Sequence, residues 1–221
     1  MAACTNELGA YSCKCNHGYF GDGFECSHKS CSDIRHQTSV SGSYVIDPDG
    51  AGGLAPFTVY CDMSDKYGVG VTLISHGSEI RTLVTGYGPP GSYSRDIHYS
   101  GASLSQRVSP HCEQYIKYEC YNAVIFDGNG YSWWVSRDSV KMNYWGGAAS
   151  GSGKCAYGMT NSCPRLNTAC NCDASDNVWR DDSGLLTDKV HLPVKQLRFG
   201  NTNRGSGYYT LGKLKCYGIS K

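Results

Sequence analysis

The chain has 221 residues, a net charge of +1, 13 cysteines, 28 glycines and 17 tyrosines. The near-zero charge excludes the cationic surface that nonspecific nucleic-acid binding needs, so no nucleic acid partner is expected. The sequence contains no run of about 20 apolar residues, which is the length that a membrane-spanning helix needs. Cysteine at this abundance indicates disulfides or metal sites. No apolar leader follows Met1, so a secreted form would already have lost its signal peptide.

Residues 1–29 are predicted to form a small domain of their own, because cysteine and glycine are dense there. The run over residues 4–26 reads CTNELGAYSCKCNHGYFGDGFEC. So short a segment cannot bury enough surface to fold without covalent links. Its cysteine spacing, its aromatic residue and its turn glycines resemble the C-terminal two-thirds of an EGF-like module.

The EGF-like resemblance implies that Cys15 and Cys26 form the terminal disulfide loop. Cys4 and Cys13 would then lack their usual partners, and we expect them to pair with each other or to remain poorly matched. In a calcium-binding subclass of the family, a residue placed like Asn6 is a ligand. The acidic ligands ahead of the first cysteine are absent here, which favours a spacer without calcium.

Residues 30–221 are predicted to form a second domain. Runs of β-branched and aromatic residues between glycine and proline breaks predict strands at Tyr44–Asp47, Phe57–Asp62 and Val69–Ser75. The sequence DPDG over residues 47–50 predicts a turn between the first two of these strands.

Three later segments are also predicted strands: Gln114–Cys120, Val190–Phe199 and Tyr208–Cys216. In the first of them, polar and apolar side chains alternate as they do along a half-buried strand. Helical periodicity is scarce, and Leu104–Val108 is the best short candidate. The expected class is therefore α+β and β-rich, with an antiparallel sheet, short helices and long loops pinned by disulfides.

The second domain resembles a fibrinogen C-terminal domain, through SGSYVIDPDG (41–50) and FTVYCDM (57–63). HCEQYIKYEC (111–120), YSWWVS (131–136) and YWGG (144–147) follow in an order similar to the fibrinogen-like domain of contactin-associated (neurexin IV type) cell-adhesion proteins. ACNCDASDNVWRDDSGLLT (169–187) continues the resemblance, which runs to about Cys216. Val71 departs from it, because most members carry tryptophan there.

The second domain holds nine cysteines, and we expect them in disulfides rather than around zinc. Structural zinc sites usually show paired C-x2-C spacing, which is missing here. The fibrinogen-like resemblance implies the pair Cys31–Cys61. The other cysteines expected in disulfides are Cys112, Cys120, Cys155, Cys163, Cys170, Cys172 and Cys216.

Because nine is odd, one cysteine of the second domain must lack a mate within it. Contactin-associated relatives usually carry a further cysteine two residues after the one that matches Cys155, where this chain has Tyr157. The unpaired cysteine, which the sequence does not identify, could be a free thiol, an intermolecular bridge that makes an oligomer, or a partner for the N-terminal cysteines.

Two groups of aspartates are candidate calcium ligands, because calcium prefers carboxylate oxygens. They are Asp47 and Asp49 in the predicted turn, and Asp173, Asp176, Asp181 and Asp182 after Cys172. Aspartate also stabilises turns, and we favour that role for both groups. The acidic run of calcium-dependent fibrinogen-like lectins is missing.

Aromatic side chains could stack on sugar rings. The candidates for ligand binding are Tyr144, Trp145 and Trp179. Trp133 and Trp134 are adjacent on one predicted strand and must face opposite sides, so at least one should be buried. A core position for Trp145 is favoured over a binding role.

No catalytic residue is predicted, because the sequence lacks the G-x-S-x-G and H-E-x-x-H motifs and its one phosphate-loop-like run, GSGK (151–154), is incomplete. We therefore expect a non-enzymatic extracellular recognition or adhesion module that binds a protein or a glycan and requires no cofactor, with calcium as an option. It would be secreted or lie on the cell surface within a longer precursor. The alternatives are a calcium-dependent acetyl-sugar lectin and a matrix protein crosslinked through the unpaired cysteine.

Overall fold

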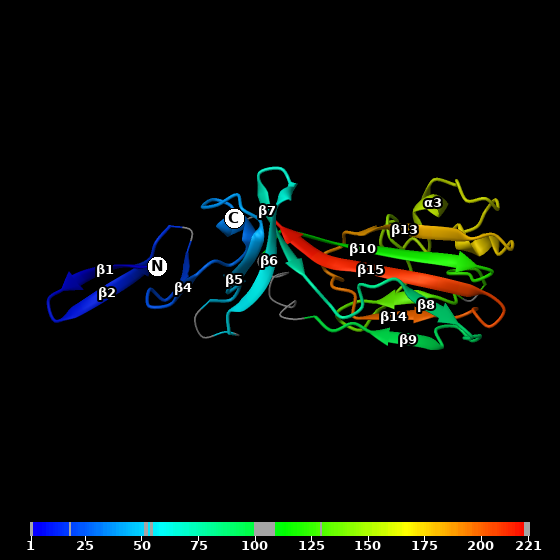
Figure 1. The fold of residues 1–221 in the computed structure, drawn as a ribbon, viewed down its shortest axis with the longest axis horizontal. Helices are drawn as coiled ribbons and strands as arrows, with labels where there is room; N and C mark the ends of the chain where they lie inside the picture. Colours follow the sequence, from blue (N-terminus) through cyan, green and yellow to red (C-terminus); the bar gives the residue numbers. More distant parts are fainter. Residues whose placement is uncertain are drawn as a thin grey trace. The chain divides into compact units, whose positions relative to one another are not determined.

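The computed structural model describes residues 2–17, 19–50, 53, 55–99, 109–128 and 130–218 (Figure 1). The chain divides into two compact units. The first unit comprises Met1–Ile74, Ser100–Cys112 and Lys215–Lys221, and the second comprises Ser75–Tyr99 and Glu113–Leu214. Both are built mainly from antiparallel strands, and the described helices are short, so the expected β-rich class is confirmed.

Two small hairpins open the first unit. Their strands are β1 (Ala2–Glu7), β2 (Ala10–Cys15), β3 (Phe20–Gly21) and β4 (Cys26–Ser27). Every residue of β1 is exposed, so this hairpin has no core of its own. Gly21 cannot be replaced without movement, because a Cβ there would lie 1.7 Å from the carbonyl oxygen of Glu25.

The remainder of the first unit has a core. Its elements are α1 (Cys31–Ile34), β5 (Gly42–Ile46), β6 (Phe57–Lys66) and β7 (Val69–Ile74). The three strands form an antiparallel meander. The buried side chains between the helix and the sheet are Cys31, Ile34, Ile46, Val59, Cys61 and Met63. The Oγ of Ser30 accepts the backbone N–H of Asp33 and caps α1, as serine at a helix start does.

Two sheets make up most of the second unit. The strands that this unit contributes to the first sheet are β8 (Thr82–Thr85), β10 (His111–Tyr121), β13 (Arg180–Leu186) and β15 (Ser206–Tyr217), with β10 between β13 and β15. The strands of the second sheet, in spatial order, are β12 (Lys141–Met142), β11 (Trp133–Val135), β14 (Gln196–Phe199) and β9 (Tyr93–Asp96). Two short helices, α3 (Ala156–Met159) and η1 (Cys172–Ala174), lie in the connecting loops. The first two residues of β10 and the last three of β15 are assigned to the first unit.

Aromatic rings form the centre of the second unit. Phe199 stacks on Tyr118 and Tyr209, with ring centroids 4.6 and 5.5 Å away. Trp145 packs against Phe199 in an edge-to-face arrangement. On β11, Trp134 is fully buried, whereas its neighbour Trp133 is half-buried. The expectation that one of the two adjacent tryptophans is buried is confirmed.

Most predicted strands are present with shifted ends, but the prediction of one strand over Val190–Phe199 was too long. Only Gln196–Phe199 is extended and paired. Ahead of it, the N–H of His191 bonds to the carbonyl of Asp188 in a turn, and Pro193 has no N–H to offer a neighbouring strand. The helix expected at Leu104–Val108 lies outside the described residues.

Candidate functional site

A groove on the second unit combines an exposed tryptophan with charged side chains. Its volume is about 350 Å³. The residues that line it are Arg81, Glu119, Trp179, Arg180 and Asp181. Trp179 is 51% exposed, so a large part of its indole ring is available to a partner. We call this feature the Trp179 groove.

Aromatic neighbours hold Trp179 in place. Its ring centroid lies 5.6 Å from that of Tyr121, at the end of β10, and 5.8 Å from that of Tyr208, on β15. The guanidinium carbon of Arg81 lies 3.4 Å from the ring centre of Tyr208, in the range of a cation–π contact. These contacts restrict the ring before any partner arrives, which lowers the entropy lost on binding.

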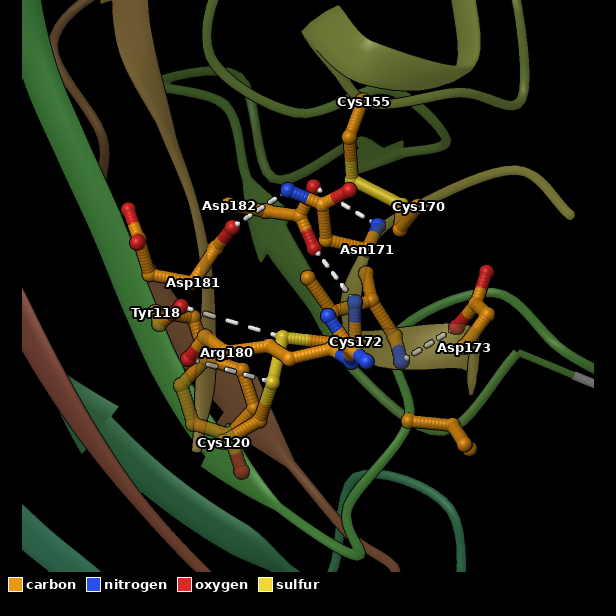
Figure 2. Close-up of a disulfide and its surroundings, with 12 residues drawn as sticks. Tyr118, Cys120, Cys155, Cys170, Asn171, Cys172, Asp173, Arg180, Asp181 and Asp182 are labelled. Atoms are coloured by element: carbon orange, nitrogen blue, oxygen red, sulfur yellow. Dashed lines mark hydrogen bonds between the residues drawn. A yellow bond between two sulfur atoms is a disulfide. The ribbon is translucent and has the colours of Figure 1, made fainter. Parts of the chain in front are cut away.

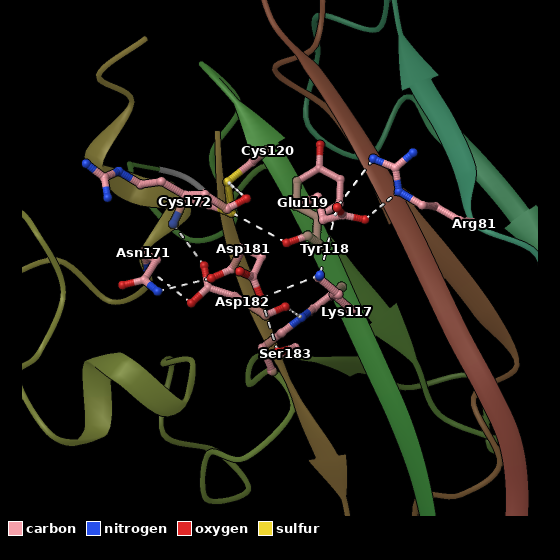
Figure 3. A network of polar contacts seen from close by, with 12 residues as sticks. Arg81, Lys117, Tyr118, Glu119, Cys120, Asn171, Cys172, Asp181, Asp182 and Ser183 are labelled. Carbon is pink, nitrogen blue, oxygen red and sulfur yellow. Dashed lines mark hydrogen bonds and ion pairs between the residues drawn. A yellow bond between two sulfur atoms is a disulfide. The ribbon is translucent and has the colours of Figure 1, made fainter. Parts of the chain in front are cut away.

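The charges beside Trp179 are paired within the groove (Figure 3). Arg81 donates to the Glu119 carboxylate through Nε at 2.7 Å and Nη2 at 3.3 Å. Lys117 Nζ lies 3.8 Å from Glu119 and 3.9 Å from Asp181. The hydrogen bond from Arg81 is the main reason that the pKa of Glu119 is lowered. The groove therefore offers charged groups of both signs and no excess of either.

The register of β10 against β13 explains how these side chains meet. Glu119 lies opposite Asp181, and Lys117 lies opposite Ser183. Along β10 the side chains of Lys117 and Glu119 are partly exposed, whereas Tyr118 and Cys120 are buried. The alternation predicted for this strand is thus confirmed.

Two disulfides hold the segment before Trp179, one to the sheet and one to the start of α3 (Figure 2). Cys120, on β10, is bonded to Cys172, at the start of η1, and Cys155 is bonded to Cys170. The carboxylate of Asp182 accepts the backbone N–H groups of Asn171 at 3.0 Å and Cys172 at 2.9 Å. Burial raises the pKa of Asp182 to about 7.

Three of the four aspartates after Cys172 are engaged by other protein groups rather than turned toward a common point. Asp176 accepts two hydrogen bonds from Arg180. Asp181 lies near Lys117 and on the exposed face of the sheet. Asp182 is buried against backbone amides. These contacts give each carboxylate a structural role.

Asp173 differs from the other three. It is 1% exposed, and its Oδ1 accepts the N–H groups of Ile125 at 2.9 Å and Phe126 at 3.1 Å. Its Oδ2 is buried without a hydrogen-bond partner among the residues that the structure describes. Asp173 and Asp127 line the same hollow, of about 390 Å³. Burial raises the pKa of Asp173, and the backbone donors oppose that rise.

The predicted turn at residues 47–50 uses its first aspartate for turn chemistry. Asp47 accepts the N–H of Gly50 at 3.0 Å and the hydroxyl of Ser27 at 3.3 Å. Asp49 is exposed. Within the described ranges, the one cluster of three potential metal-ligating side chains is Cys155, Cys170 and Asp182, and its two cysteines are bonded to each other.

The structure removes Tyr144 and Trp145 from the candidates for ligand binding and confirms the core position favoured for Trp145. Both are buried, with 2% and 0% of their surfaces exposed. Trp145 Nε1 donates to the carbonyl of Asp182, and the carbonyl of Tyr144 accepts from Trp134 Nε1. Neither ring can stack on a sugar without opening the core. Trp179 is the candidate of the three that stays on the surface.

Twelve of the cysteines form six disulfides, which include the two pairs implied by the family resemblances. The pairs are Cys4–Cys13, Cys15–Cys26, Cys31–Cys61, Cys112–Cys216, Cys120–Cys172 and Cys155–Cys170. Cys163 is the free one, which corrects its inclusion among the disulfide cysteines. It is 8% exposed, and burial raises the pKa of its thiol.

Sequence reasoning missed Arg81, Glu119 and Arg180 as lining residues of the groove, and Tyr121 and Tyr208 as ring neighbours of Trp179. These five residues come from three strands and a loop, and only the sheet brings them together. No local spacing could have signalled the group.

Comparison with known proteins finds one matching domain family and several similar proteins. Residues 1–26 match the EGF domain family. The chain is similar to contactin-associated protein 1. Identity to that protein is 40% over 200 residues in Rattus norvegicus and 39% in Homo sapiens, and identity to Neurexin-4 of Drosophila melanogaster is 34% over 235 residues.

These matches cover 86% of this chain for the contactin-associated proteins and 97% for Neurexin-4. The chain spans only 14% and 18% of the respective relatives' lengths. The similarity agrees with the resemblance to contactin-associated and neurexin IV proteins and to an EGF domain. Among the described residues, no helix is long and apolar enough to cross a membrane.

Proposed function

We propose that this chain is a non-enzymatic extracellular recognition module and that the Trp179 groove contacts its partner. The observation that carries the proposal is an indole ring that is 51% exposed yet flanked by Tyr121 and Tyr208. Half-exposed aromatic rings held by neighbours are typical energetic centres of protein interfaces.

The charge balance of the groove favours a protein partner over a polyanion. Arg81 and Glu119 neutralise each other, and Lys117 lies between Glu119 and Asp181. A partner must therefore meet alternating charges around an aromatic centre, which is the usual pattern of a polar rim around an apolar core. An anionic chain would gain little from cations that are already paired.

The relatives support an extracellular place for this module. The similar proteins include contactin-associated protein 1 of two organisms, and residues 1–26 match an EGF domain. Six disulfides also fit an oxidising compartment. We infer a secreted or cell-surface location, a fibrinogen-like type for residues 30–221, and an adhesion role with an extracellular protein of the contactin kind as partner.

Surface plasmon resonance with an immobilised contactin ectodomain tests this proposal. We expect the wild-type chain to bind and Trp179→Ala to bind about 30-fold more weakly, the loss typical of an interface centre. The matched control is Tyr67→Ala, because Tyr67 is a fully exposed aromatic in the turn after β6. If both substitutions weakened binding equally, the groove would not be the binding site. If the wild-type chain did not bind, contactin would not be the partner.

A calcium ion beside Asp173 is a second proposal, favoured by its buried and unpartnered Oδ2. Carboxylate oxygens are preferred calcium ligands, and Asp127 lines the same hollow. Calcium should raise the midpoint of thermal unfolding of the wild type and of Asp176→Asn, and should leave that of Asp173→Asn unchanged. A wild-type midpoint that is the same in calcium and in chelator would exclude the ion and weaken the lectin alternative.

The matrix-crosslinking alternative gains no support from Cys163. Its side chain is buried, so it would have to be uncovered before a second chain could reach the sulfur.

A further inference from the structure

A second tryptophan surface of the second unit has unpaired cations, in contrast to the Trp179 groove. It lies on the outer face of the sheet formed by β12, β11, β14 and β9. A hollow of about 530 Å³ is present there, within the size range of small-ligand sites. The lining residues are Asp96, Trp133, Val135, Ser139, Lys141, Lys195, Gln196 and Arg198. We call it the Trp133 hollow.

Strand register creates this face. Trp133 lies opposite Arg198, and Val135 lies opposite both Gln196 and Lys141. Alternate residues on the same strands, such as Trp134 on β11 and Leu197 on β14, are fully buried in the core, so the outward row is fixed by the inward one.

Three cations gather at the hollow. Lys141 Nζ lies 3.8 Å from the ring centre of Trp133. Lys195 Nζ donates to the hydroxyl of Ser139 at 2.7 Å. Arg198 donates through Nη1 to the carbonyl of Gly91 at 3.3 Å. All three contacts fix a cation without neutralising it.

The carboxylate beside these cations is occupied elsewhere. Asp96 accepts from the side-chain amide of Gln196 at 2.5 Å, and Gln196 in turn accepts from Arg198 Nε at 2.6 Å. Across the described part of the chain, neither lysine nor Arg198 forms an ion pair, whereas Arg81, Lys117 and Arg180 all do. The hollow therefore carries a local excess of positive charge in a chain whose net charge is only +1.

Gly91 shows that the tryptophan side of the hollow is closely packed. A Cβ at this position would lie 2.1 Å from the ring of Trp133. The ring thus lies close to the backbone at Gly91 and has the ammonium of Lys141 over its face. This packing holds one cation at a defined place, which favours a ligand with a matching anionic group.

We propose that the Trp133 hollow binds a sulfated polysaccharide chain of the glycosaminoglycan type. Arginine and lysine recognise sulfate and carboxylate groups, and each of the three cations that line the hollow can meet such a group. Sugar hydroxyls supply the donors that Asp96 and Ser139 can accept. An acidic peptide brings the negative charges but few hydroxyls to donate to the Asp96 carboxylate and the Ser139 hydroxyl. This proposal uses none of the residues of the Trp179 groove, so either can fail alone.

Binding of the full chain to an immobilised heparin octasaccharide tests the proposal. The test variant combines Lys141→Gln, Lys195→Gln and Arg198→Gln. The control variant combines Lys14→Gln, Arg165→Gln and Arg204→Gln, which removes the same charge from exposed positions elsewhere. We expect the test variant to lose about tenfold or more in affinity and the control to lose less than about threefold, because only the hollow groups its cations.

Two further arms decide between ligands. Desulfated heparin should bind the wild type at least about tenfold more weakly, because the sulfate groups meet the cations. Poly-glutamate binding as tight as heparin would overturn the glycan in favour of an acidic peptide. If the test and control variants lost the same affinity for heparin, binding would depend on the overall charge of the chain, and the proposed site would be wrong. Circular dichroism of each variant checks that it is folded, and Lys141→Gln alone replaces the triple variant if that one unfolds.

Discussion

The first 27 residues and the second unit both contain two disulfides, yet the bonds stabilise them in different ways. In the N-terminal hairpins every residue of β1 is exposed, and Leu8, Tyr11 and Phe24 remain in solvent. The second unit buries a stack of aromatic rings around Phe199. Covalent links therefore replace a core in the hairpins, whereas in the second unit they fasten loops to a sheet that has its own core.

The largest effect is expected from removing the N-terminal links. Replacing Cys4, Cys13, Cys15 and Cys26 with alanine should abolish the protection of amide hydrogens in residues 2–27 against exchange. The reason is that no buried apolar surface remains to hold the hairpins. The control is Cys155→Ala with Cys170→Ala, which should leave the central strands of the second unit protected. Hairpins that stay protected after the quadruple substitution would mean that packing, not sulfur, stabilises them.

The next largest effect is expected in the core of the second unit. Trp134→Ala should lower the free energy of unfolding by about 3–5 kcal/mol, as measured by urea denaturation, because a fully buried indole leaves a cavity. Trp133→Ala is the matched control, one residue away on the outer face, and should cost clearly less. Similar losses for the two substitutions would contradict the assignment of inner and outer faces to β11.

A smaller effect concerns the buried carboxyl that supports the loop at the disulfides. Burial raises the pKa of Asp182 from 3.8 to about 7. Between these values the unfolded chain is ionised at Asp182 and the folded chain keeps its proton, so the free energy of unfolding falls as pH rises from about 4 to 7. We expect a contribution of a few kcal/mol, because each tenfold difference in the acid dissociation constant corresponds to about 1.4 kcal/mol, and the value of about 7 already includes the opposing effect of the two backbone donors.

Urea unfolding of the wild type and of Asp182→Asn at pH 4, 5.5 and 7 isolates this contribution, because other groups titrate equally in both. The difference between the two proteins should change steadily across that range. A constant difference would show that the carboxyl titrates alike in the folded and unfolded chains.

The smallest effect is expected at Cys163. A thiol reagent at neutral pH should label the native protein slowly and the unfolded protein at one thiol per chain, because the sulfur is buried and the pKa of the thiol is raised. On a non-reducing gel, the fraction of monomer should be the same for Cys163→Ala as for the wild type. Rapid labelling of the native chain would mean that Cys163 is open to intermolecular bonding.

Local patterns in the sequence were sufficient for some of the molecule. Alternation predicted the exposed and buried faces of β10, and β-branched runs placed β5, β6 and β7 within a few residues. Alternation depends only on neighbouring residues, so it can be recognised in the sequence without knowledge of the fold. The strand predicted over Val190–Phe199 failed in its first half, where Val190 is exposed in a turn and Leu192 and Val194 are buried without lying in a strand.

By itself, the sequence determined that this is a disulfide-linked, β-rich chain with an EGF-like start, since cysteine spacing and residue periodicity are written along the chain. Only the tertiary structure decided which aromatic rings face solvent and which cations are paired. Tyr144, Trp145 and Trp179 are alike in chemistry, and the packing around Phe199 buries the second of them while Trp179 stays outside. Lys117 and Lys141 are likewise equivalent in sequence, but cross-strand register brings the first near the carboxylate of Asp181 and the second over the indole ring of Trp133, because such partners meet only when the sheets form.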